Sequence, residues 1–172
     1  PRYSIATPVL AVPLFAGLRA AAPLVPGWTA ELQQLRQGRF LDVAHVVEVL
    51  LGSAVVGLAA MFVFLANPVR GPAWLWSMAF GFGTSAWSIA SRALWSHGMS
   101  MLLLAAALYL LLGKRRWPLA AGVLLGLAVW VRPLNAIPLV CLAVWLRRDG
   151  WRLLAGAAAA SAPFVAYCLA VY

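Results

Sequence analysis

Charged side chains are scarce in this chain of 172 residues, and acidic ones are the scarcest. Only 10% of the residues are charged, and four Asp and Glu stand against thirteen Lys and Arg. A soluble domain carries about 25% charged residues, so the composition excludes an ordinary soluble domain. With 65% hydrophobic residues and a mean hydropathy of +0.91, the sequence predicts an all-α integral membrane protein.

Other absences limit the chemistry. The two cysteines, Cys141 and Cys168, lie in apolar stretches without metal-ligand spacing and are interpreted as buried thiols. No zinc motif, glycine-rich phosphate loop or hydrolase triad is present, so we predict no metal site and no cofactor, and the catalytic residues stay unassigned. The net charge of +9 comes from arginines scattered between apolar runs. We interpret it as charge beside membrane segments and predict no nucleic-acid partner.

The long apolar runs are what the sequence does contain, and a spanning helix needs about 20 such residues. Four runs qualify: Val43–Ala66, Pro72–Ala90, His97–Gly113 and Leu153–Tyr172. A fifth, Trp117–Leu146, is interrupted by the sequence RPLN at residues 132–135. Basic clusters flank this run at both ends, and basic residues in short loops favour the cytoplasmic face. Both ends of the run Trp117–Leu146 are therefore predicted on one face, which requires a hairpin of two short arms. Residues 43–172 then predict about six transmembrane helices.

The first 42 residues predict an external juxtamembrane region. Pro8–Val25 is apolar but contains Pro13, Pro23 and Arg19, which indicates an amphipathic helix on the external leaflet. The alternative is that Pro8–Val25 spans the membrane and inverts everything downstream. Because the sequence starts inside what looks like a motif, PRYSIATPVLAVP, we expect a fragment of a longer chain.

Two stretches bring arginines to the predicted external side. SRALWSHG contains Arg92 and His97, and RPLN contains Arg132 and Asn135. Taken alone, the first loop is explained as well by an interfacial arginine and a loop histidine. Ionisable groups near the bilayer are costly and often functional, and a guanidinium binds a lipid phosphate bidentately. We predict a lipid-phosphate site at these four residues, with helix capping as the alternative role of Asn135.

Three stretches carry a resemblance to a known family. RYSIATPVLAVPLF resembles its juxtamembrane segment, FGTSAWSIASRALWSHGMSMLLLAAALYLLL its helix-loop-helix, and GLAVWVRPLNAIPLV its hairpin. In order and spacing they resemble the integral-membrane C-type glycosyltransferases, near bacterial protein mannosyltransferases and lipid-A aminoarabinose transferases. The likeness covers most of the chain.

The resemblance implies a multi-pass inner-membrane enzyme. Such an enzyme moves a sugar from a polyprenyl-phosphate-linked donor to an acceptor on the external face. Arg92, His97 and Arg132 match positions facing the cavity that holds the lipid phosphate. Family members carry a catalytic Asp on the first external loop, which precedes the point where this sequence begins, so we expect this chain alone to be inactive. The alternative is a transporter or lipid-binding module with an anion-holding cavity.

Overall fold

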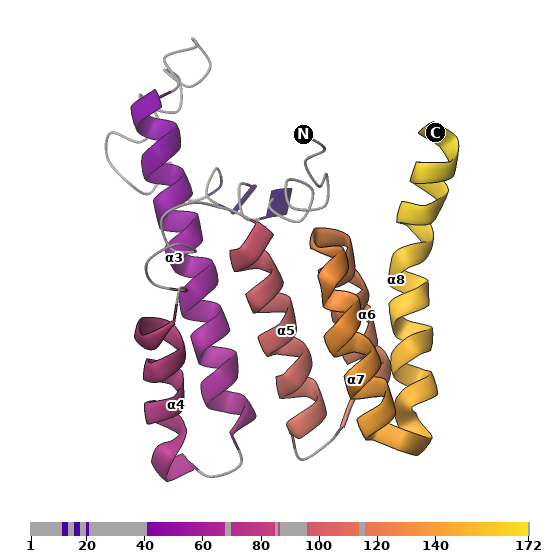
Figure 1. Ribbon diagram of the computed structural model, residues 1–172. Coiled ribbons are helices and arrows are strands. Elements are labelled where there is room, and N and C mark those ends of the chain that lie inside the picture. Colours follow the sequence, from indigo (N-terminus) through magenta and orange to yellow (C-terminus); the bar gives the residue numbers. More distant parts are fainter. Residues whose placement is uncertain are drawn as a thin grey trace.

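The computed structural model describes residues 12–13, 16–17, 20, 41–67, 70–84, 86, 96–113 and 116–171. In these ranges it contains no strand and six α-helices longer than ten residues: α3 (Leu41–Ala66), α4 (Arg70–Gly83), α5 (Ser96–Leu112), α6 (Pro118–Val131), α7 (Ala136–Leu146) and α8 (Gly150–Val171). Consecutive helices run in opposite directions (Figure 1). The all-α prediction is confirmed for the described residues.

The predicted juxtamembrane region falls almost wholly outside the described residues. Within residues 1–40 only 12–13, 16–17 and 20 are described, and these are helical. The predicted helix Pro8–Val25 and the division at residue 42 therefore stay predictions.

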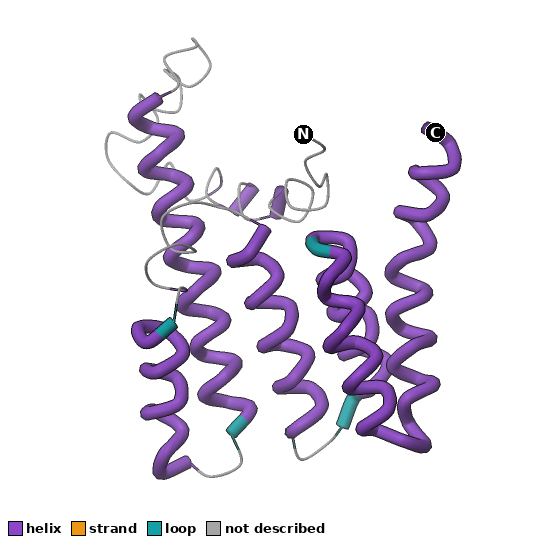
Figure 2. The backbone as a smooth tube through the Cα atoms, in the orientation of Figure 1, coloured by secondary structure: helices purple, strands orange, loops and turns teal. Residues whose placement is uncertain are grey.

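The predicted hairpin is present between α6 and α7. The two helices lie antiparallel and are joined by a short turn that contains the 3-10 helix η3 (Pro133–Asn135) (Figure 2). Arg132 is extended, with φ −148° and ψ 116°, because a following proline disfavours the helical conformation. Pro118 occupies the first turn of α6, where a missing backbone N–H costs nothing. Proline thus sets both the start of α6 and the turn after it.

Two other predicted boundaries differ. The predicted run Pro72–Ala90 is observed as α4 only to Gly83, and residues 87–95 lie outside the described ranges. The last helix begins at Gly150, three residues before the predicted Leu153. Residues 147–149 form a second 3-10 helix, η4 (Arg147–Asp149), directly before it. In this turn Arg147 has a φ of 49°, so the chain reverses direction without a longer loop.

The contact between α6 and α8 is the most extensive in the bundle, and glycines make it close. A Cβ built on Gly122 would lie 2.0 Å from the carbonyl oxygen of Leu153, and one on Gly156 would lie 2.1 Å from that of Leu119. A Cβ built on Gly126 would lie 2.6 Å from the carbonyl oxygen of Ala157. Gly122 and Gly126 form a GxxxG motif, which lets two helix backbones approach each other in membranes.

Much apolar surface remains on the outside of the bundle. Two helical segments are long and apolar enough to cross a membrane, Glu48–Ala66 and the 38-residue stretch Pro133–Ala170, and only 28% and 17% of their apolar windows are buried. The second segment contains the turn at Arg147 and therefore comprises α7 and α8. Cys141 is exposed, so the prediction of a buried thiol there is wrong: its face of α7 points away from the other helices. Crossing by all six helices stays a prediction.

Candidate anion-binding site

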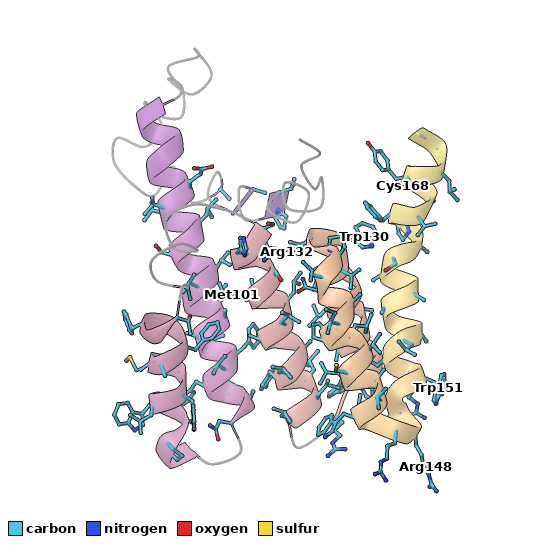
Figure 3. All side chains as sticks on the ribbon, viewed as in Figure 1. Met101, Trp130, Arg132, Arg148, Trp151 and Cys168 are labelled. Atoms are coloured by element: carbon cyan, nitrogen blue, oxygen red, sulfur yellow. The ribbon has the colours of Figure 1, made fainter. Side chains whose placement is uncertain are left out.

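Charged residues divide between the two ends of the bundle. Arg148 and Trp151 lie at one end and Arg132 and Trp130 at the other (Figure 3). The first end also carries Arg116, Arg147 and Arg152. The ion pair found there joins Arg152 Nη1 to Asp149 Oδ1 at 3.2 Å, with side chains 54% and 43% exposed. An exposed pair of this kind contributes little stability. Arg132 therefore lies well apart from the other described arginines.

Arg132 and His97 meet at the second end. His97 belongs to the first turn of α5, and Arg132 lies between α6 and η3. Nη1 of Arg132 is 2.5 Å from Nδ1 of His97. A guanidinium has donors but no acceptor, so Arg132 donates and the His97 Nδ1 accepts. The bond therefore assigns the ring proton of a neutral His97 to Nε2.

Asn135 and Ser100 form a second polar contact beside this pair. Nδ2 of Asn135 donates to Oγ of Ser100 at 2.7 Å and to the carbonyl oxygen of Ala128 at 2.7 Å. Asn135 is 8% exposed and Ser100 is 5% exposed, so both bonds are shielded from water. An amide nitrogen has two hydrogens, and these two bonds use both.

Apolar side chains support the polar contacts from within the bundle. Met99 and Leu103 of α5 pack against Ala128 and Val131 of α6 in one buried cluster. The cluster includes Met99, directly before Ser100, and Val131, directly before Arg132, so packing fixes the relative position of the two helix ends that carry the polar residues.

The chemistry that remains available at this end is donor chemistry. With its Nδ1 accepting from Arg132, neutral His97 presents Nε2–H, and Arg132 retains four further N–H groups and a permanent positive charge. Such a set matches an anion with several acceptor oxygens, such as a phosphate, and has no acceptor for a cation. The pair is partly open, because His97 is exposed and Arg132 is half-buried.

The structure brings together three of the four residues predicted from sequence. His97, Arg132 and Asn135 lie at one end of the bundle, whereas Arg92 lies outside the described residues. Asn135 does not cap α7 with its side chain, and its amide hydrogens are directed to Ser100 and Ala128 rather than outward.

Sequence reasoning missed Ser100. A signal for it exists, because HGMS and RPLN each place two polar residues three positions apart. Both cross-helix contacts join residues 35 positions apart. His97 pairs with Arg132, the first polar residue of each stretch, and Ser100 pairs with Asn135, the second.

Comparisons with known proteins add no relative. No protein-family model, no curated protein and no solved structure matches the chain.

Proposed function

We propose that this chain is a multi-pass protein of the inner membrane and forms the membrane domain of a glycosyltransferase with a polyprenyl-phosphate-linked sugar donor. The observation that carries the proposal is the contact between His97 and Arg132 at one end of an apolar helical bundle. Two stretches that resemble the C-type glycosyltransferases supply these residues. Their free donors suit the phosphate of such a lipid.

The exposed surface supports the membrane setting. Val144 is 72% and Leu169 is 79% exposed, and long apolar helices present most of their surface outward. In water this surface would favour aggregation, whereas acyl chains solvate it. The end with Arg116, Arg147 and Arg148 is the cytoplasmic one by the charge rule, and the end with His97 and Arg132 is external.

The proposed chemistry places Arg132 and His97 at the leaving group. When the bond between the anomeric carbon and the phosphate oxygen breaks, negative charge develops on the phosphate. Preorganised donors that face this charge lower the barrier. The acceptor must also lose a proton to a general base, which in the resembling family is an Asp of the first external loop.

A binding measurement tests the proposal. Arg132→Ala should weaken the affinity of the chain for a polyprenyl phosphate in micelles by about tenfold or more, because a hydrogen bond to a charged group contributes about 1.5–3 kcal/mol. Arg132→Lys should weaken it less, because charge remains but the planar fork is lost. Arg148→Ala, an exposed arginine at the other end, is the matched control. Unchanged affinity in Arg132→Ala would overturn the proposal.

A second candidate function is transport of an anionic substrate. The interrupted α6–α7 hairpin favours it, because transporters build midplane sites from discontinuous helices. An assay of the longer protein separates the two functions. For a glycosyltransferase, Arg92→Ala and His97→Ala should each lower kcat/KM for sugar transfer by about tenfold, or roughly 1.4 kcal/mol. Substrate flux across proteoliposomes without transfer would identify a transporter.

A further inference from the structure

We propose that Asn135 and Ser100 are positioning residues that fix the orientation of Arg132 toward His97. The inference rests on the proposed function only for its binding readout. Asn135 itself hydrogen-bonds to Ser100 and to the backbone carbonyls of Ala128 and Arg132, and to neither the guanidinium nor the imidazole. It acts through the backbone of the turn and through α5.

The first step concerns the hydrogen bonds through which Asn135 fixes the backbone of Arg132. Its N–H donates to the carbonyl oxygen of Arg132 at 2.9 Å, while the N–H of Arg132 donates to the carbonyl oxygen of Ala128 at 2.9 Å. Nδ2 of Asn135 donates to that same carbonyl of Ala128 at 2.7 Å. Both peptide groups that flank the Cα of Arg132 are therefore tied to Asn135, one directly and one through a shared acceptor.

The second step is the tie to α5. The other hydrogen of Asn135 Nδ2 is donated to Ser100, which lies three residues after His97 on the same helix. Residues three apart lie on the same side of a helix, about one turn from each other. The bond between Asn135 and Ser100 therefore fixes the position of α5, and with it the His97 ring, relative to the turn that carries Arg132.

The third step is that burial gives this contact its strength. Asn135 and Ser100 are nearly inaccessible, so water does not replace their bond at low cost. Arg132 and His97 are more exposed, and their own bond competes with water and with a ligand. The buried bond between Asn135 and Ser100 therefore fixes the geometry in which the more exposed bond between Arg132 and His97 forms.

The substitution Asn135→Leu tests the inference with little change in volume. The carbonyl of Ala128 keeps the N–H of Arg132 as its donor, and the Ser100 hydroxyl can donate to a carbonyl of its own helix. The variant should therefore fold but lose the tie between the turn and α5. Leu134→Ala in the same turn is the matched control, because Leu134 is 67% exposed. Ser100→Ala and Ser100→Thr form a second pair, in which Thr keeps the hydroxyl acceptor.

The readout that a merely structural residue would not move is the tautomer of His97. In ¹⁵N-histidine-labelled protein in micelles, His97→Gln identifies the His97 signals against those of the other histidine, His45. The wild type and Leu134→Ala should show one dominant neutral tautomer, with the proton on Nε2. Asn135→Leu and Ser100→Ala should show a mixture of both tautomers, and Ser100→Thr should restore the wild-type spectrum.

Binding of a polyprenyl phosphate is the second readout. Asn135→Leu should weaken it by about tenfold, the lower end of what outer-shell partners contribute at metal sites. A mixed tautomer in Asn135→Leu, together with unchanged affinity for the polyprenyl phosphate in Arg132→Ala, would leave the positioning role intact and the proposed function in error. An unaltered tautomer in both Asn135→Leu and Ser100→Ala overturns the positioning role. The positioning role is also overturned if Asn135→Leu binds more weakly only because its melting temperature is lower, with no change in the His97 spectrum.

Discussion

Gly122→Ala is expected to separate α6 from α8 and to destabilise the bundle. The added Cβ would lie 2.0 Å from the carbonyl oxygen of Leu153, 2.8 Å from its carbon and 3.0 Å from its Cα. All three are backbone atoms, so no rotamer change relieves the clash and α8 must shift by an ångström or more. Overpacking of this kind costs about 1–3 kcal/mol, and we expect the upper part of that range.

Gly57→Ala provides the matched control. Gly57 lies inside α3, and a Cβ built there meets nothing within 4 Å. Replacing a helix-interior glycine by alanine at an open position is expected to stabilise by about 0.5–1 kcal/mol. The two variants make the same chemical change, so their difference, about 3 kcal/mol in the free energy of unfolding, isolates the clash.

The assay is unfolding in mixed micelles followed by tryptophan fluorescence. Trp130 of α6 reports on the interface, because its ring centroid lies 4.7 Å from that of Phe164 on α8. Gly122→Ala should unfold at a lower denaturant fraction than wild type, and Gly57→Ala at the same or a higher one. If both variants shift alike, the close approach of α6 and α8 is not what holds these helices together.

Two further predictions concern the turn after α7 and the topology. Arg147→Gly should raise the free energy of unfolding by about 1 kcal/mol, because Arg147 has a φ of 49° and glycine adopts such values without strain; a loss of stability in the same micelle assay would contradict this. A cysteine at Leu134, which is 67% exposed in the turn that carries Arg132, should react with a membrane-impermeant maleimide added outside intact cells, and one at Gly113 should not, with the opposite pattern refuting an external site.

The helices were predictable because hydropathy and proline act locally. The predicted run Val43–Ala66 and the observed α3 end at the same residue, and Pro133 explains the turn between α6 and α7. The turn at Arg147 was not predictable, since no glycine marks its left-handed residue. The packing of the flanking helices can impose a strained backbone conformation on a turn. The local sequence then gives no sign of that conformation.

The site was predictable only in part, for a related reason. An arginine in an apolar segment stands out, so Arg132 was found from sequence together with His97. Ser100 does not stand out, because a serine in an apolar helix commonly bonds to its own backbone. The role of Asn135 depends on which groups its amide reaches, Ser100 and the carbonyl of Ala128. That is tertiary information, and the spacing of polar residues alone does not give it.

The short α6–α7 hairpin has a consequence for the lipid around it. At 1.5 Å per residue, α6 with 14 residues and α7 with 11 residues are about 21 Å and 17 Å long, against a hydrocarbon core of about 30 Å. In the proposed setting this hydrophobic mismatch thins the adjacent leaflet and draws head groups and water inward. In that setting a lipid phosphate would reach Arg132 by moving sideways within its own leaflet, without lifting its tail out of the bilayer.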